Sequence, residues 1–401
     1  MSSSTDLGAL AEALDLLGRK LDEDEPRLGI SFPYVTRPDG SWDTMLASRS
    51  AGYDGEDWSH GNWFCGFWVG LLAAAHVHTG EDRYLDLAKQ RMLLVAQRAD
   101  DPNTHDIGFI FWSSAVPLHR LTSDPIYADL ALRAADRLRA RVVVTETGSY
   151  VSSWGPLSDP RGRAASAIDT MANIPLLYWA AEQSGDASFR LAAEAHARMT
   201  EKGFVRENDT LFHAVEYDTV TGARQRGYTF QGYADGSSWS RGTGWAVYGY
   251  AATAAVSGQR HYLDLAVRLA ERWLEQLGDR TCPPWDFDDP SSQPVEDSAA
   301  AAIMVAALLD LGDLHSDEDQ RQRWRSTAMR LLSGLARDYL ARDPVHRGLL
   351  MHGCYSKPHN IGPDAAVLFG DYYFVEALMR VLHPGKLVRQ LEPLGGGGTR
   401  R

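Results

Sequence analysis

The sequence predicts an all-α fold, an (α/α)6 barrel in which six helical hairpins form an inner and an outer ring. Three observations lead to this prediction. Helical periodicity runs through most of the chain, and strand-like alternation is scarce. Helices that are apolar nearly all round alternate with amphipathic helices. Several helix pairs also share one sequence plan, which is typical of repeated helical hairpins.

The helical segments follow one another closely, with short turns between them. In chain order they are 6–23, 60–79, 82–99, 108–121, 125–141, 166–184, 186–203, 242–256, 259–277, 296–313, 318–341 and 364–382. Two segments, "DTLFHAVEYD" and "HRGLLMHGCYS", instead alternate like the arms of small hairpins. The chain is therefore expected to be almost entirely helical.

Four amphipathic segments repeat the same plan: "GEDRYLDLAKQRM", "SDPIYADLALRAADRL", "GDASFRLAAEAHARM" and "GQRHYLDLAVRLAERWL". Each opens with a turn, continues with an aromatic residue and becomes a helix rich in Ala, Leu and Arg. Each also follows a more apolar helix. Because an apolar helix must be enclosed whereas an amphipathic helix can face water, the apolar helices should form the inner ring. An open solenoid would expose them, so a closed ring fits the composition better.

Length and composition place the chain among globular proteins. We expect a single domain over 1–392 and a flexible tail over 393–401. The formal net charge of -13 argues against binding to nucleic acid or to anionic membranes, since both need a basic surface. Three scattered cysteines favour a reducing compartment. With neither a signal peptide nor a membrane span in the sequence, we expect a cytoplasmic monomer or weak homodimer.

Two carboxylates stand out among the polar segments that precede the inner helices. Asp106 begins the helix that continues "IGFIFW", and taken alone it is best interpreted as an N-cap. Asp169 lies in the otherwise apolar run "AASAIDTMANIPLLYWA", which looks helical, and Asn173 would share its helical face. Its structural alternative is a buried acid that pairs with an arginine or with Asn173. Burial would raise the pKa of such an acid, as a general acid requires.

Together the two acids indicate a site for glycosidic bond chemistry, because glycoside hydrolases usually use a pair of carboxyl groups as catalytic residues. Trp, His, Gln and Arg residues lie in the neighbouring polar segments. Arg241 in "WSRGTGW" has a planar guanidinium that suits bidentate binding of a sugar carboxylate. The alternative role for Arg241 is to pair with Asp235 or with another acid at the same rim.

Five motifs in collinear order give the sequence a family resemblance. They are "NTHDIGF", "DTMANIPLLYWA", "SWSRGTGWAVYGY", "EDSAAAAI" and "FGDYYFVEAL". Together they resemble glycoside hydrolase family 88, the unsaturated glucuronyl hydrolases, and the matches extend from about Trp63 to Phe374. The family's fold is an (α/α)6 barrel, which agrees with the ring expected from periodicity.

The resemblance implies the release of a 4,5-unsaturated uronic acid from the non-reducing end of oligosaccharides left by polysaccharide lyases. The reaction is hydration of a vinyl ether: a proton is added at C4, water is added at C5, and the hemiketal opens. By the family pattern Asp169 is the general acid and base, and Asp106 assists it. The family's binding residues carry over, motif by motif, to Trp63, His105, Trp154, Asn173, His213, Gln231, Arg241 and Trp245. Neither a cofactor nor a metal is implied.

One segment departs from the family pattern. Many members have a Ser-bearing "VDES"-type segment before the "GDYFF" motif, whereas this chain has "GPDAAVLFGDYYF". Ala365 and Ala366 therefore lack hydroxyls, and Ser356 or Lys357 are candidates to replace the lost contacts. The preference for the neighbouring sugar is expected to differ accordingly.

Three other hypotheses compete with this one. Unsaturated rhamnogalacturonyl hydrolases share the barrel and act by similar chemistry on pectin fragments. Sugar epimerases on the same barrel use pairs of histidines, and no second histidine looks as well placed as His213. A non-catalytic glycan-binding protein is disfavoured because both aspartates are present.

Overall fold

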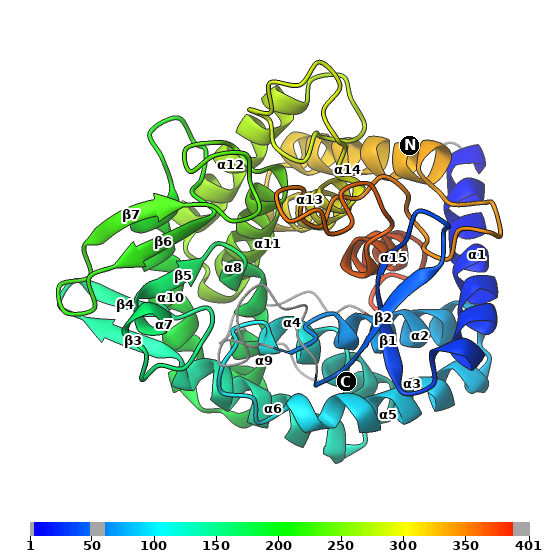
Figure 1. Cartoon of the computed structure of the whole chain (residues 1–401), viewed down its shortest axis with the longest axis horizontal. Coiled ribbons are helices and arrows are strands. Elements are labelled where there is room, and N and C mark those ends of the chain that lie inside the picture. The colour runs from blue at the N-terminus through cyan, green and yellow to red at the C-terminus, as the bar shows by residue number, and fades with distance from the viewer. Residues whose placement is uncertain (1–3, 49–60, 388–401) are drawn as a thin grey trace.

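Helices that are apolar on most sides form a closed inner ring (Figure 1). The computed structural model describes residues 4–48 and 61–387. Within them the ring runs through α2 (Cys65–Thr79), α4 (Ile107–Trp112) with α5 (Ala115–Thr122), α8 (Thr170–Asn173) with α9 (Pro175–Ser184), α11 (Ser240–Ser257), α13 (Ser298–Leu314) and α15 (Leu368–Leu382). Each packs on the next, and α15 returns to α2. The predicted (α/α)6 barrel is confirmed.

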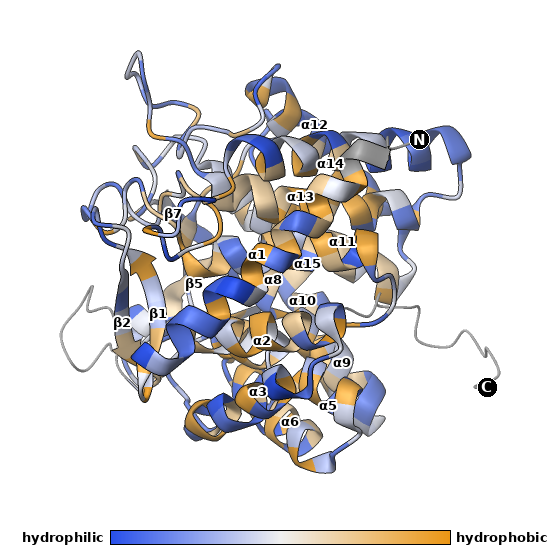
Figure 2. Cartoon of the chain, turned by 90° about the vertical axis from the view of Figure 1, so that its right-hand side faces the viewer, coloured by the Kyte–Doolittle hydropathy of each residue, from blue (hydrophilic) through white to orange (hydrophobic). Residues whose placement is uncertain are grey.

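Amphipathic helices surround this ring. They are α1 (Ser4–Leu28), α3 (Asp82–Val95), α6 (Pro125–Ala140), α10 (Ala187–Phe204), α12 (Arg260–Leu277) and α14 (Glu318–Asp338). In Figure 2 outer helices such as α3 and α6 carry both hydrophilic and hydrophobic residues. The aromatic residue that opens each of the four repeated segments is buried against the barrel: Tyr84, Tyr127, Phe189 and Tyr262. The shared sequence plan thus corresponds to one packing unit.

Turn chemistry explains how each inner helix gives way to its outer partner. Gly80, Gly185 and Gly258 end α2, α9 and α11 in the left-handed conformation, which glycine adopts without steric cost. Asp124 and Asp186 then cap α6 and α10 by accepting backbone N–H bonds in the first turn. Short polar turns are therefore sufficient to reverse the chain.

Two predicted inner helices are interrupted. The segment 108–121 divides into α4 and α5, because the hydroxyls of Ser113 and Ser114 bond back to the carbonyls of Phe109 and Ile110 at the break. The segment 166–184 begins as a strand rather than a helix. It then forms α8 and α9, which meet at Pro175, a residue without an N–H to continue the helical ladder.

Short strands lie outside the ring. β1 (Ser31–Thr36) pairs with β2 (Trp42–Leu46), and β3 (Val142–Thr145) pairs with β4 (Gly148–Val151). A three-stranded antiparallel sheet has the order β5 (Ala165–Ala167), β6 (Ala214–Tyr217) and β7 (Arg224–Tyr228). The remaining short helices are α7 (Pro160–Ala164) and the 3-10 helix Ala96–Arg98.

The strand predictions had mixed outcomes. "DTLFHAVEYD" contains β6 and is confirmed as a hairpin arm. "HRGLLMHGCYS" is not one: it makes isolated pairings, Leu340 with Leu350, Gly353 with Ala365 and Ser356 with Ile361. The tail predicted over 393–401 lies outside the described residues, and the single domain over 1–392 stays a prediction.

A close helix contact supports the segment that carries Asp169. A methyl group at Gly249 of α11 would lie 2.1 Å from the carbonyl oxygen of Met171 in α8. We expect Gly249→Ala to lower the free energy of unfolding by about 1–3 kcal/mol, because this contact leaves no room for a Cβ. Urea denaturation measures the change. Gly8→Ala at an exposed position of α1, where a Cβ meets open space, is the control. Equal stability of the two variants would contradict the prediction.

Candidate active site

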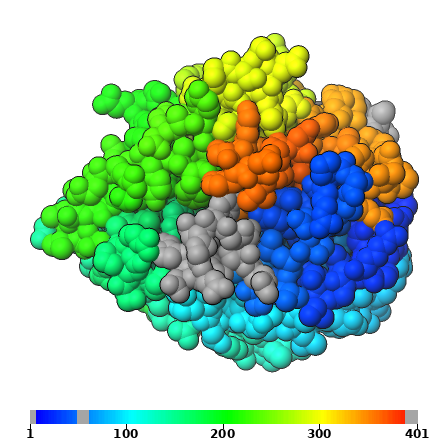
Figure 3. Space-filling model, in the orientation of Figure 1, coloured from blue at the N-terminus to red at the C-terminus, as the bar shows by residue number. Residues whose placement is uncertain are grey.

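A pocket of about 260 Å³ opens where the segments that precede the inner helices meet. Its lining residues are Trp63, His105, Asp106, Trp154, Asp169, Tyr228, Phe230, Gln231, Tyr355 and His359. These residues come from segments far apart in the sequence. Figure 3 shows such segments side by side on one face, including the region of β1 and β2 and the chain before α15. The predicted common rim is thus present in the structure.

The structure brings six of the ten sequence-predicted residues into the pocket wall. They are Trp63, His105, Asp106, Trp154, Asp169 and Gln231. The other four, Asn173, His213, Arg241 and Trp245, are not among the lining residues and are buried behind them. Asn173, His213 and Arg241 each contact a lining residue or the chain beside one. Trp245 packs on Phe109 of α4 with ring centroids 4.9 Å apart.

Asp106 precedes α4 at the floor of the pocket, but its carboxylate does not cap the helix. The capping interpretation is therefore wrong. Instead, Oδ2 accepts a hydrogen bond from the Thr104 hydroxyl at 3.1 Å, and Oδ1 lies 3.3 Å from Nε2 of His105. Burial raises the pKa of Asp106 to about 7, and the nearby charge of Asp169 acts in the same direction.

Asp169 lies at the junction between β5 and α8, not inside a helix as predicted. Ser166 pairs with Val215 in the sheet, so the backbone before Asp169 is extended. Burial raises the pKa of Asp169 to about 6, and the positive charge of Arg241 opposes that effect. Both candidate carboxyls therefore retain protons to higher pH than an ordinary aspartate.

Asn173 holds the two acid-bearing turns together. Its side-chain oxygen accepts the backbone N–H of Phe109 in α4 at 2.5 Å, and its Nδ2 donates to the carbonyl oxygen of Asp169 at 3.0 Å. Asn173 is fully buried and does not face the pocket. Its predicted binding role stays a prediction, and in the structure its side chain contacts the Asp169 backbone.

A second bridge joins the same turns through His105. Nδ1 of His105 and the hydroxyl of Thr170 in α8 are 2.6 Å apart. The backbone N–H of His105 also donates to the carbonyl oxygen of Ser153 at 2.7 Å. Asp106 and Asp169 are therefore carried by turns that are linked at two points.

His213 and Trp245 are buried near the carboxyl of Asp169. Nε2 of His213 lies 3.7 Å from Oδ2 of Asp169, and the imidazole stacks on Trp239. Burial, reinforced by the charge of Arg241, lowers the pKa of His213 well below its ordinary value. Among the described residues, Nε2 of His213, Oδ2 of Asp169 and Nε1 of Trp245 are buried polar atoms without a hydrogen-bond partner. Such atoms are rare in folded proteins, and here they mark a polar site.

Arg241 does not offer its guanidinium to the pocket. The side chain is buried, and Nη1 forms an ion pair with Asp297 at 2.6 Å. Nη2 donates to Oε1 of Gln231 at 2.7 Å and to the carbonyl oxygen of Tyr355 at 2.6 Å. The predicted direct clamp on a sugar carboxylate is not formed by this arrangement. The alternative of an acidic partner is correct, although the partner is Asp297 rather than Asp235.

Aromatic rings build much of the remaining wall. Trp63 stacks on Phe369 with ring centroids 5.2 Å apart, and its Nε1 donates to the Tyr355 hydroxyl at 3.5 Å. Trp154 meets Phe230 edge to face at 5.1 Å. Flat rings held in this way present apolar faces against which a sugar ring can stack.

Sequence reasoning missed four lining residues: Tyr228, Phe230, Tyr355 and His359. In the segment "CYSKPHN", which contains Tyr355 and His359, only Ser356 and Lys357 are predicted from the sequence to make contacts in the site. In the structure Ser356 bonds to Nδ1 of His359 at 2.8 Å, and Lys357 pairs with Asp289, so neither lines the pocket. Ala365 and Ala366 are buried away from it. The segment's contribution to the lining is therefore Tyr355 and His359.

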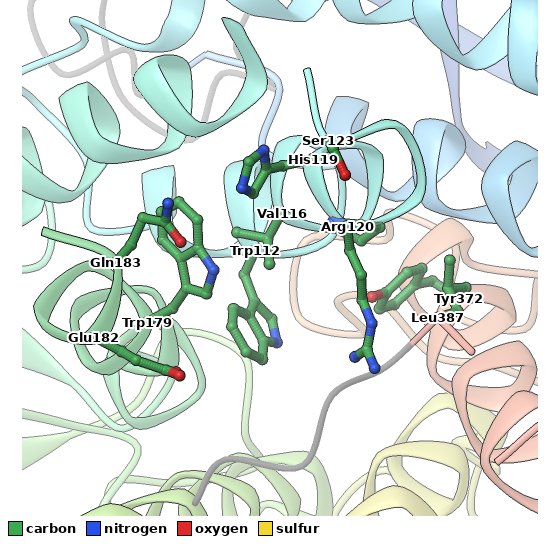
Figure 4. Close-up of a pocket in the computed structure, with 11 residues that line it drawn as sticks. Trp112, Val116, His119, Arg120, Ser123, Trp179, Glu182, Gln183, Tyr372 and Leu387 are labelled. Atoms are coloured by element: carbon green, nitrogen blue, oxygen red, sulfur yellow. The ribbon is translucent and has the colours of Figure 1, made fainter. Parts of the chain in front are cut away.

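A second pocket, of about 390 Å³, lies near the C-terminal ends of α5 and α9 (Figure 4). It is lined by Trp112, Trp179, Arg120 and His119, among others. Glu182 is the one acid among its lining residues. Because it lacks a pair of carboxyls, this pocket does not fit the chemistry that the sequence predicts.

Residues 4–48 and 61–387 offer neither a cluster of metal ligands nor a membrane-spanning helix. No group of three or more His, Cys, Asp or Glu side chains there is arranged to hold a metal ion. No helix there has both the length and the apolar character needed to cross a membrane.

Comparison with known proteins identifies the family. Residues 41–316 match the model of Glycosyl Hydrolase Family 88. The unsaturated glucuronyl hydrolase of Bacillus sp. (strain GL1) is 34% identical over 381 residues, which is 93% of this chain and 96% of that protein. An unsaturated chondroitin disaccharide hydrolase of Streptococcus agalactiae is 30% identical, over 79% of this chain and 81% of its own length.

Solved structures agree with the sequence comparison. The Bacillus sp. GL1 unsaturated glucuronyl hydrolase, described as responsible for the degradation of glycosaminoglycan, superposes with a TM-score of 0.84 at 31% identity, covering 94% of this chain and 97% of its own. A variant of an unsaturated glucuronyl hydrolase from Streptococcus agalactiae, complexed with dGlcA-GalNAc6S, gives a TM-score of 0.77 at 25% identity, covering 94% of this chain and 92% of its own. Since the family model matches more than half of the chain and a 34% identical relative matches nearly all of it, the chain belongs to Glycosyl Hydrolase Family 88.

Proposed function

We propose that this protein is an unsaturated glucuronyl hydrolase. It releases the 4,5-unsaturated uronic acid from the non-reducing end of glycosaminoglycan-type oligosaccharides. The observation that carries the proposal is the pair of carboxyls with raised pKa, Asp106 and Asp169, in one pocket with Trp63 and Trp154. The named activities of the relatives support the same substrate class.

The proposed reaction consumes one water and needs a proton donor and a proton acceptor. The acid transfers its proton to C4, and positive charge develops at C5 and the ring oxygen. Water then attacks C5 and loses a proton to the same group, which returns it to its starting state. The resulting hemiketal opens, the aglycone sugar leaves, and the uronate is left as a keto acid. One carboxyl that is protonated at the start therefore serves both steps.

We assign the acid and base role to Asp169. Its Oδ2 is without a hydrogen-bond partner among the described residues, whereas Thr104 and His105 hold both oxygens of Asp106. Asp106 is thus fixed in place, where it can bind sugar hydroxyls, and its pKa of about 7 keeps it protonated over the range in which Asp169 holds its proton. His213, kept neutral by burial, and Trp245 surround Asp169 from behind, while Gln231 and His105 offer hydrogen bonds from the wall.

Unsaturated disaccharides from chondroitin, heparin, hyaluronan and pectin lyase digests provide the test. The ultraviolet band of the conjugated enol acid should decay as the free sugar is released. The pectin-derived substrate separates this activity from that of an unsaturated rhamnogalacturonyl hydrolase. A band that persists with every substrate would refute the hydrolase proposal.

The pH dependence of turnover follows from the protonated state that the acid requires. Burial raises the pKa of Asp169 to about 6 and that of Asp106 to about 7. Asp169 loses its proton above its pKa, so kcat is expected to fall as pH rises through about 6. The fall should approach tenfold per pH unit above that value. Initial rates between pH 4 and 9 measure the profile, and a kcat that rises across this interval would contradict the assignment.

Two further features belong to the proposal. We place the protein in the cytoplasm, because Cys65, Cys282 and Cys354 are buried free thiols, as a reducing compartment would keep them. The proposed oligomeric state is a monomer or weak homodimer. Sedimentation velocity tests the second feature.

A further inference from the structure

We propose that Asp297 is a positioning residue, which acts through Arg241 to hold two walls of the catalytic pocket and to balance the charge behind Asp169. This inference deepens the proposed function and rests on it for the identity of the reaction. Asp297 caps α13, lies outside the pocket lining and makes no contact with Asp169 that would give it a direct role.

The ion pair between Asp297 and Arg241 is fully enclosed. The two side chains are 0% and 2% exposed, and the carboxylate lies 2.6 Å from Nη1. The other groups that meet Asp297 are also donors: the backbone N–H of Ala300 at 3.2 Å and that of Cys354 at 3.3 Å. Burial raises the pKa of Asp297, whereas Arg241 and the two backbone donors lower it, because a carboxylate that meets N–H donors is favoured in its ionised form. Asp297 therefore serves as the counter-charge of Arg241.

Arg241, which is held by Asp297, in turn fixes the positions of two lining residues. Its guanidinium donates to the side-chain oxygen of Gln231 and to the backbone carbonyls of Cys354 and Tyr355. Gln231 follows β7, and Tyr355 belongs to the segment before α15, so two distant parts of the chain meet at one planar group. The backbone N–H of Cys354 is held by Asp297 itself. The pair thus fixes Gln231 and Tyr355 relative to α11 and α13.

The same pair influences the charge felt by the catalytic acid. Charged or titratable groups from several elements lie near Asp169: Asp106 and His105 from the turn before α4, His213 before β6, Arg241 in α11, and Tyr228, Tyr355 and His359 in the same pocket wall. Arg241 is the cation in this set, and its field lowers the pKa of both Asp169 and His213. Asp297 neutralises part of that field. Removal of the Asp297 charge should therefore favour the ionised form of Asp169.

Asp297→Asn tests the effect on the position of the lining residues and the effect on the pKa of Asp169. Asparagine keeps the shape of the aspartate side chain and lacks its charge. The limb of the kcat profile that falls with rising pH should move to lower pH, by up to about one unit. KM should rise several-fold as Gln231 and Tyr355 lose their fixed positions. Arg241→Gln, which removes the opposite charge, should move the same limb to higher pH. A purely structural role would not give shifts of opposite sign, so unmoved limbs in both variants would overturn the proposal.

A matched control separates the effect of position from that of a lost buried charge. Asp310 pairs with Arg380 in a mostly buried site on α13 and α15, away from the catalytic pocket. Asp310→Asn should lower stability and leave the pH limb in place. If Asp297→Asn does not fold, Asp297→Glu keeps the charge and displaces it, so KM should rise while the limb stays. A limb that moves in Asp297→Glu without a change in KM would contradict the inference.

Direct titration of Asp169 makes the result independent of turnover. Carboxyl ¹³C NMR of the full chain, assigned with Asp169→Asn, reports the pKa of Asp169 in the wild type and in Asp297→Asn. A lower pKa in the variant is expected, and an unchanged one would overturn the electrostatic part. Absence of turnover in the wild type would refute the proposed function and leave this measurement valid.

Discussion

Replacing Asp169 with Asn is expected to lower kcat by at least about 10³-fold, because the amide neither donates a proton to C4 nor accepts one from water. The substitution is nearly isosteric at the junction of β5 and α8, and Asn173 contacts only the backbone carbonyl of this residue. Folding should therefore be retained. Loss of the ultraviolet band under single-turnover conditions is the measurement, with circular dichroism as the check on fold.

A second buried aspartate provides the matched control. Burial also raises the pKa of Asp24 in α1 to about 6, but Asp24 accepts a hydrogen bond from the Trp42 indole and lies outside the pocket lining. Asp24→Asn should keep kcat within a few-fold of the wild type. If both variants lost turnover equally, burial of an acid rather than its place in the pocket would explain the result, and the role of Asp169 would be disproved.

Replacing Arg241 with Met is expected to cost about 3–5 kcal/mol of stability, because it leaves the buried carboxylate of Asp297 without its partner. The carbonyls of Cys354 and Tyr355 lose a donor in the same step. A lower urea midpoint measures the loss. The double variant with Asp297→Leu should recover part of it, since no uncompensated charge then remains.

A buried ion pair outside the pocket is the control for the effect of Arg241→Met on KM. Arg91 and Glu25 are 5% and 10% exposed and 2.6 Å apart, at the contact of α3 with α1. Arg91→Met should cost comparable stability and leave KM unchanged. Arg241→Met should raise KM as well, because Gln231 loses the group that orients it. Equal KM values for the two variants would show that the Arg241 pair has no influence on the pocket.

The fold could be predicted from the sequence because its determinants are local. Periodicity, turn residues and the alternation of apolar with amphipathic helices all act within about 20 residues of chain. The extended start of the segment 166–184 was not predicted because it depends on another part of the molecule. Ser166 is extended only because Val215 pairs with it, and a helical pattern within 166–184 carries no trace of that partner.

The candidate site could be predicted in part. Asp106, Asp169 and the tryptophans were recognised as members of motifs, and the structure places them in one pocket. Motifs do not reveal whether a side chain lines the pocket or is buried behind the lining residues, so Arg241 was expected to face the sugar. Its partner Asp297 is 56 positions away in sequence, and only the folded chain brings the two together. His359 belongs to a short loop without any periodicity and left no usable signal.

The sheet of β5, β6 and β7 links the pocket to a second hairpin. The base of the β6–β7 hairpin carries His213 and Tyr228, and the backbone N–H of Ile168 donates to the His213 carbonyl beside Asp169. At the other end, Asp218 accepts two backbone N–H bonds from the turn. That turn also meets the β3–β4 hairpin, since the backbone N–H of Glu146 donates to the Val220 carbonyl at 2.8 Å and the Thr147 hydroxyl donates to the Thr221 carbonyl at 2.7 Å. A change in the length of either turn would therefore be transmitted along the sheet to the residues beside Asp169.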